Sequence, residues 1–113
     1  MHTPSTTALA WTLLIAAGLL EIVWAIALKQ SEGFTRLWPA TIGLTTAAIS
    51  FVMLTLALRD LPAGTAYAIW VGIGALGVAV VGIVALGESA SPARLACLAL
   101  ILLGVIGLKV VDG

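Results

Sequence analysis

Four long apolar runs follow one another along this chain of 113 residues, and they restrict its fold more than any other feature. The runs lie at about 9–29, 37–58, 62–86 and 94–111. Each has close to the roughly 17–25 residues that an α-helix needs to cross a bilayer. The segments between them are short, as is usual for antiparallel neighbouring helices. The pattern predicts an all-α membrane protein, with four transmembrane helices in a single domain, residues 1–113.

Composition supports this class and excludes several others. The chain is 62% hydrophobic and 9% charged, whereas a soluble domain usually carries about 25% charged residues. The net charge is zero, so no basic patch suggests nucleic acid binding. A single cysteine, Cys97, cannot form an internal disulfide or a thiolate metal site. We therefore expect no metal and no cofactor. We also expect no enzymatic activity, because the sequence offers no pair of a nucleophile and a base, and the one histidine, His2, lies in the polar segment before the first run.

The residues at the ends of the runs fit helix termini in a membrane. The first run lacks a basic start and a small-residue cleavage site, so we interpret it as a retained helix rather than a signal peptide. Proline is tolerated in the first turn of a helix, and all four prolines stand near an expected start: Pro4, Pro39, Pro62 and Pro92. Charges other than Glu21 lie at the ends, as solvated or snorkelling side chains do. Trp11 and Trp38 are placed as in an aromatic belt.

The distribution of Lys and Arg gives almost no preference for one orientation. The first and third connecting segments carry three of these residues on one side of the membrane, against two in the second segment and the tail on the other. The positive-inside rule needs a larger asymmetry to set the topology. Both orientations are therefore permitted in one membrane, and an antiparallel dimer becomes possible.

Glu21 lies inside the first apolar run, near its middle, and is the only carboxylate within any run. A charged side chain at that depth costs roughly 2.5–3.5 kcal/mol on insertion scales, which makes such a residue a candidate functional site. On a helix, Ala17, Gly18 and Trp24 share its face. The small residues Ala17 and Gly18 are expected to leave room beside the carboxylate. The alternative is a structural glutamate that neighbouring helices satisfy.

Other runs carry polar and aromatic residues that could join Glu21. Ser50 is the polar group nearest the centre of the second run, although membrane serines often only bond to a carbonyl of their own helix. Tyr67 and Trp70 share a face of the third run, where they could also be core filling. A buried indole N–H or phenol O–H needs an acceptor, and Glu21 is the best one available.

Glycines mark the third and fourth runs. Gly72, Gly74 and Gly77 match the spacing of a dinucleotide-binding motif, but that motif needs a strand before it and a helix after it. We reject a nucleotide site and expect close helix packing or a bend instead. Gly104 and Gly107 belong to a stripe of small residues in the fourth run, which resembles a helix-association surface.

A membrane carboxylate among aromatic rings and hydroxyls suits a cation. A carboxylic acid removed from water holds its proton more readily, and an entering cation would displace that proton. Exchange of a cation for a proton follows as a hypothesis. A planar guanidinium ion could pair with a carboxylate through two hydrogen bonds and place its face on an aromatic ring. Four helices are too few to enclose a path, which again favours a dimer.

Four stretches resemble the small multidrug resistance family: G-L-L-E-I-V-W-A-I-A-L-K (18–29), G-F-T-R (33–36), P-A-G-T-A-Y-A-I-W-V-G-I-G-A-L-G (62–77) and L-L-G-V-I-G-L-K (102–109). The resemblance extends over nearly the whole chain, from Ala10 to Lys109. Trp24, Ser50 and the G-T-A-Y-A-I-W block look like the guanidinium-exporting branch. The resemblance implies an antiparallel, dual-topology homodimer in a bacterial inner membrane. It would export guanidinium in exchange for protons by alternating access.

The resemblance also implies roles for single residues. Glu21 would bind proton and substrate in turn, and Trp24 and Ser50 would orient the carboxylates. Tyr67 and Trp70 would line the site. The glycine set Gly72, Gly74 and Gly77 would form a bend that alternates access, and the fourth helix with Gly104 and Gly107 would carry much of the dimer contact.

Two other functions stay open from the sequence. The first is an exporter of the same family that acts on quaternary ammonium or other lipophilic cations, and Met53 in the second run would widen access for them. The second is a small interaction or pore-forming membrane protein that does not transport, in which Glu21 would be dispensable.

Overall fold

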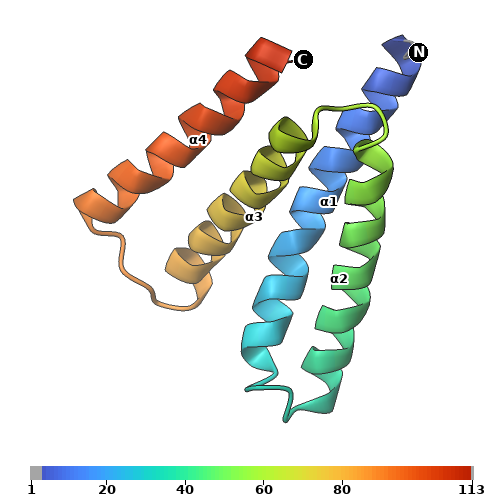
Figure 1. Ribbon diagram of the computed structural model, residues 1–113. Helices are drawn as coiled ribbons and strands as arrows, with labels where there is room; N and C mark the ends of the chain where they lie inside the picture. Colours follow the sequence, from blue (N-terminus) through green and yellow to red (C-terminus); the bar gives the residue numbers. More distant parts are fainter. Residues whose placement is uncertain (1–3, 113) are drawn as a thin grey trace.

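The computed structural model describes residues 4–112, which form four helices joined by short loops (Figure 1). They are α1 (Pro4–Gln30), α2 (Leu37–Ala57), α3 (Ala63–Ala85) and α4 (Pro92–Asp112). All four are long and apolar enough to cross a membrane. The prediction of an all-α protein with four membrane-spanning helices is therefore confirmed. The polar residues before Pro4, His2 among them, lie outside the described residues.

The helix bounds differ from the sequence expectation mainly at the start of the chain. The ends of α2, α3 and α4 fall within two residues of the expected positions, whereas α1 begins at Pro4 rather than at about residue 9. Apolarity marks the part of a helix that lies in hydrocarbon. It does not mark where the helical backbone begins, because polar residues continue a helix into the interface. Pro4 and Pro92 are accordingly the first helical residues, a position that proline tolerates.

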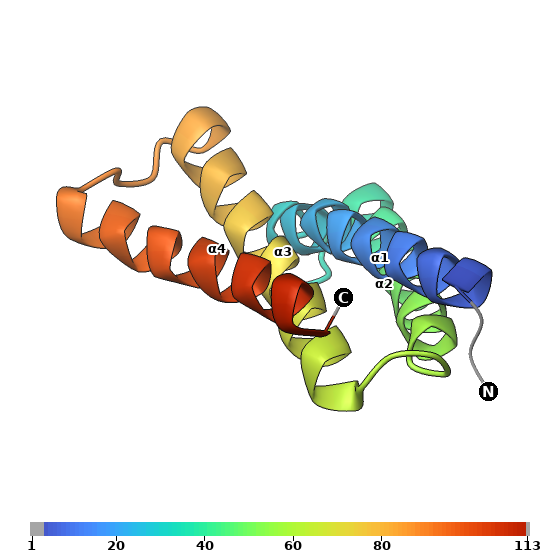
Figure 2. The same ribbon diagram turned by 90° about the horizontal axis from the view of Figure 1, so that it is seen from above.

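The helices form an open arrangement in which α1 is central. α1 packs along α2 and also against α3, while α4 packs mainly against α3 (Figure 2) and reaches α1 through Lys109, which lies over the ring of Trp11. The arrangement is flat, with principal extents of 45 × 36 × 17 Å. No residue of α4 is buried. The single chain therefore leaves one of its apolar helices almost uncovered.

The buried core joins the first half of α1 to the end of α2 and the start of α3. Its members are Ala10, Trp11, Leu14, Ala17, Leu54, Ala57, Leu61, Ala66, Ile69 and Trp70. Trp11 therefore does not belong to an aromatic belt: it is 7% exposed and packs within the chain. Trp38, by contrast, is 73% exposed at the start of α2, as a belt residue should be.

The loop between α1 and α2 turns the chain through left-handed backbone conformations. Glu32, Gly33 and Phe34 have φ angles of 50°, 71° and 68°. Buried Ser31 organises this turn, because its hydroxyl donates to the carbonyl of Leu28 at 2.6 Å and accepts the N–H of Phe34 at 3.1 Å. The hydroxyl thus caps the end of α1, where main-chain carbonyls lack partners.

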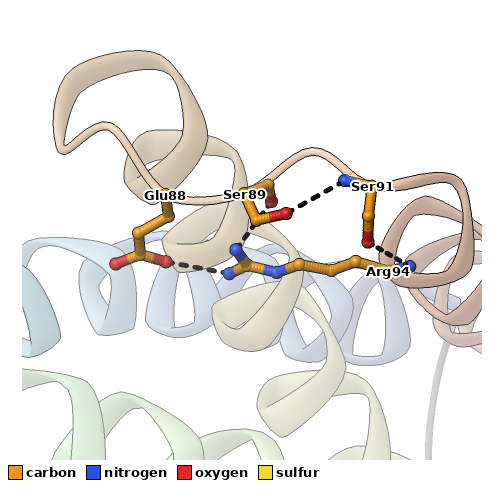
Figure 3. Close-up of polar contacts among 4 residues, drawn as sticks. All are labelled: Glu88, Ser89, Ser91 and Arg94. Carbon is orange, nitrogen blue, oxygen red and sulfur yellow. Dashed lines mark hydrogen bonds and ion pairs between the residues drawn. The ribbon is translucent and has the colours of Figure 1, made fainter.

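The loop between α3 and α4 is held by polar contacts (Figure 3). Gly87, with φ of 72°, ends α3, and the N–H of Glu88 returns to the carbonyl of Gly82 at 2.9 Å. Arg94 reaches back from α4 to pair with the carboxylate of Glu88 at 2.8 Å. Ser91 accepts the N–H of Arg94 at 3.2 Å, which caps the start of α4. The direction in which α4 leaves α3 is set by this loop.

Candidate functional site

Glu21 is the centre of the candidate site. It lies on α1 and is half-buried, and it is the only carboxylate away from the helix ends. Its Oε1 atom is buried and has no hydrogen-bond partner in the described part of the chain. Buried polar atoms are rarely left unpaired, and each such atom calls for an explanation. The described part of the chain therefore leaves one carboxylate oxygen of Glu21 without a partner.

The carboxylate of Glu21 is seated against the backbone of α3 at Gly74. A Cβ atom at position 74 would stand 2.3 Å from both Cδ and Oε1 of Glu21, so no larger residue leaves the carboxylate where it is. In the same way, the side chain of Ile22 packs against the backbone at Gly77, and the side chain of Ile73 packs against Gly18 on α1. Of the two expectations for the glycines of α3, close helix packing is confirmed. A bend at Gly72, Gly74 and Gly77 stays a prediction.

A chain of hydrogen bonds joins three helices beside the site. The indole N–H of Trp70 on α3 donates to the hydroxyl of Ser50 on α2 at 3.0 Å. That hydroxyl donates to the main-chain carbonyl of Ala17 on α1 at 2.7 Å. Ser50 is fully buried and Trp70 is 4% exposed. Because Ala17 is one turn before Glu21, these bonds fix α2 and α3 against α1 next to the carboxylate.

These bonds differ from the arrangement expected from the sequence. Within a single chain, neither Ser50 nor Trp24 bonds to Glu21: Ser50 uses Ala17, and the indole N–H of Trp24 is buried and unpaired in the described residues. The room expected beside Gly18 is filled by Ile73. Ala17 is likewise completely covered. A single chain therefore leaves less free space beside the Glu21 carboxylate than we expected from the small residues Ala17 and Gly18.

Aromatic rings extend from Glu21 along α1, α2 and α3. Trp24 lies one turn after Glu21 and stacks on Phe51, with ring centroids 6.2 Å apart. Phe51 contacts Trp70 at 5.2 Å, and Trp70 contacts Tyr67 at 5.6 Å. Sequence reasoning missed Phe51, although its place directly after Ser50 was the available signal. The row offers ring faces to which a cation can bind.

The structure brings together only some of the predicted residues. Glu21 is seated against Gly74, and Ser50 bonds to Trp70. Trp24 reaches Trp70 only through Phe51, and Tyr67 is 58% exposed. On α4, a Cβ atom at Gly104 or Gly107 would meet nothing within 4 Å. The described residues contain no group of three or more His, Cys, Asp or Glu that could hold a metal ion.

Comparisons with known proteins show the family to which the chain belongs. The family profile described as Small Multidrug Resistance protein matches residues 9–101. The chain is 57% identical over 101 residues to the guanidinium exporter of Escherichia coli K12, which covers 89% of this chain and 96% of that protein. It is 58% identical, with the same coverage, to the guanidinium exporters of Citrobacter freundii and Salmonella typhimurium. With its four apolar helices and these bacterial relatives, the chain is a multi-pass protein of the inner membrane and belongs to the small multidrug resistance family.

Proposed function

We propose that this protein exports guanidinium in exchange for protons, through alternating exposure of Glu21 to the two sides of the membrane. The names of the relatives supply the substrate, because proteins 57–58% identical over most of the chain are guanidinium exporters. Residues 1–113 would act as one transmembrane domain without a cofactor or metal, and the protein would not be an enzyme.

The observation that carries this proposal is the unpaired carboxylate oxygen of Glu21. A guanidinium ion presents several N–H donors in a plane and can pair with a carboxylate through two of them. The stacked rings of Trp24 and Phe51 stand one turn from Glu21 and suit the face of the same ion. A proton on the carboxylate would remove the charge that attracts guanidinium, so the two would be bound in turn.

The surrounding residues would serve this exchange in distinct ways. Ser50 and Trp70 would hold α2 and α3 in position through their bonds beside Ala17. Trp24 would direct its unpaired indole N–H toward a carboxylate or substrate. Tyr67 would line the site with its exposed ring, and the bend at Gly72, Gly74 and Gly77 would let α3 open one side and then the other.

A second copy of the chain in the opposite orientation would complete the site. In the single chain no residue of α4 is fully buried, and a Cβ atom at Gly104 or Gly107 would meet nothing within 4 Å, as expected for a surface that receives another helix. The near-even distribution of Lys and Arg permits both orientations. An antiparallel homodimer would place two Glu21 residues and two sets of aromatic rings around one cavity.

The test is transport by the purified protein in proteoliposomes. Guanidinium is added to one side, and the current and the internal pH are recorded for the native chain and for Glu21→Gln. We expect guanidinium to drive proton movement in the native chain and none in the variant, because the amide neither releases a proton nor pairs with the cation as an anion. Glu32→Gln is the matched control, since Glu32 is an exposed loop carboxylate, and it should transport as the native chain does.

The same assay separates the other functions. Aromatic faces also bind quaternary ammonium ions, and the ring of Phe51 is 49% exposed, so tetramethylammonium is tested beside guanidinium. Equal or larger signals with tetramethylammonium would favour a broad exporter of lipophilic cations. A Glu21→Gln variant that transports as well as the native chain would contradict exchange at Glu21 and favour a non-transport or pore-forming protein.

A further inference from the structure

An apolar groove runs along the side of the chain where α1 and α4 both pack on α3, with Lys109 of α4 over Trp11 of α1 at one end. It consists of two adjoining cavities of about 240 Å³ and about 540 Å³, which share Ile73 of α3 and Val105 of α4 in their walls. Nearly every other residue that lines the groove is aliphatic. This surface is separate from the carboxylate site, which lies among α1, α2 and α3.

One end of the groove carries a cation. Lys109 stands in the last turn of α4, and its ammonium group lies 4.6 Å from the centre of the Trp11 ring. Lys109 has no ion pair among the described residues: the nearby carboxylate of Asp112 accepts a hydrogen bond from Thr65 instead. A lysine one turn from the end of a spanning helix lies at the depth of lipid headgroups.

The length of the groove matches one leaflet of a bilayer. On α1 it extends from Trp11 to Ile22, which is about 16 Å at 1.5 Å per residue. Half of a hydrocarbon core of roughly 30 Å is about 15 Å. A groove that begins at a cation and continues in aliphatic walls for this distance has the dimensions of one acyl chain below its headgroup.

The small-residue surface of α4 lies on its other side. At 100° per residue, Gly104 and Gly107 point between about 100° and 160° away from Val105 and Lys109, which line the groove. A second copy docked on these glycines would leave the part of the groove at Val105 and Lys109 open to lipid.

We propose that the α1–α3–α4 groove binds one anionic phospholipid per chain, with an acyl chain along Ile73 and Val105 and the headgroup on Lys109. This site is independent of cation transport. The cation at its end selects anionic over zwitterionic headgroups, and the aliphatic walls hold the chain. Bound lipid would cover apolar surface that α1 and α4 leave exposed.

The experiment is native mass spectrometry of the detergent-solubilised protein with phosphatidylglycerol and phosphatidylcholine at equal concentration. The native chain should retain phosphatidylglycerol in preference. Lys109→Gln should lower retention of phosphatidylglycerol about fivefold, the effect of one basic residue at an anionic surface, and leave phosphatidylcholine unchanged. Lys29→Gln is the matched control: Lys29 is also in the last turn of its helix but does not line this groove, so its removal should have little effect.

A second variant tests the walls of the groove. Ile106→Phe enlarges a half-exposed residue that lines the groove and should lower retention of both lipids. The proposal is overturned if Lys109→Gln retains phosphatidylglycerol as the native chain does, or if Lys29→Gln loses as much. It is also overturned if Ile106→Cys, with Cys97→Ser, forms a disulfide between two chains, because a second copy would then occupy the groove.

Discussion

Replacing Ser50 by alanine should loosen the packing of α1, α2 and α3, and the structure gives the size of the effect. The change removes two buried hydrogen bonds, from Trp70 to Ser50 at 3.0 Å and from Ser50 to Ala17 at 2.7 Å. Each is worth about 0.5–1.5 kcal/mol in net terms, and bonds between membrane helices average about 0.6 kcal/mol. The indole N–H is then left without an acceptor. We expect a loss of about 2 kcal/mol.

The measurement is unfolding by an increasing mole fraction of SDS in mixed micelles, at fixed protein concentration because association shifts the midpoint. Thr55→Ala is the matched control. Thr55 also loses a hydroxyl, but its bond at 2.8 Å goes to the carbonyl of Phe51 in its own helix and is exposed. That variant should change the free energy of unfolding by less than about 0.5 kcal/mol.

A double-mutant cycle separates the hydrogen bonds from simple loss of volume. Ser50→Ala should cost about 1 kcal/mol less in a Trp70→Phe background than in the native chain, because one of the two bonds is already absent. Equal effects in both backgrounds would refute the coupling of Trp70 to Ser50. If Ser50→Ala and Thr55→Ala lower the free energy of unfolding equally, the hydrogen bonds that Ser50 makes between helices do not add to stability.

Two further predictions concern the backbone. Gly74→Ala should lower guanidinium-evoked current at least tenfold, because the added Cβ occupies the place of the Glu21 carboxyl group. Gly64→Ala, where a Cβ meets nothing within 4 Å, should transport normally, and similar currents from both variants would contradict this role of Gly74. Phe34→Gly should raise the free energy of unfolding by about 1 kcal/mol in the SDS assay, because a left-handed conformation is costly for a residue with a Cβ. An unchanged or lower SDS midpoint would show that φ of 68° at Phe34 is not a strained position.

Apolarity and residue type were enough to predict much of the fold. The four spans follow from the length of the apolar runs, and Glu21 stands out because a carboxylate at that depth is costly. The start of α1 could not be predicted in this way, since the helical backbone extends beyond the apolar run. Trp11 was misplaced for a related reason. Its distance from the helix end suits a belt, but which face of α1 meets α2 and α3 decides that it is buried.

The contacts between helices were the part of the structure that could least be predicted from the sequence. Ser50 could be recognised as a central polar residue, but its acceptor is a main-chain carbonyl on another helix, which no side-chain pattern reveals. Gly74 could be recognised as small, but only the crossing of α1 and α3 shows that it faces Glu21. Phe51 was missed because its neighbours Trp24 and Trp70 come from two other helices.

The acceptor at the end of the Trp70–Ser50–Ala17 chain is a main-chain carbonyl, a group that does not titrate. A change in the charge of Glu21 therefore does not change the charge of this acceptor, even though the carboxyl group lies one turn away. The parts of α1, α2 and α3 that these hydrogen bonds join are expected to behave as one rigid body through a transport cycle. Rearrangement would then fall on the portions of the chain beyond it, the second half of α3 and α4, where Glu88 and Arg94 link the two helices through an exposed and easily broken contact.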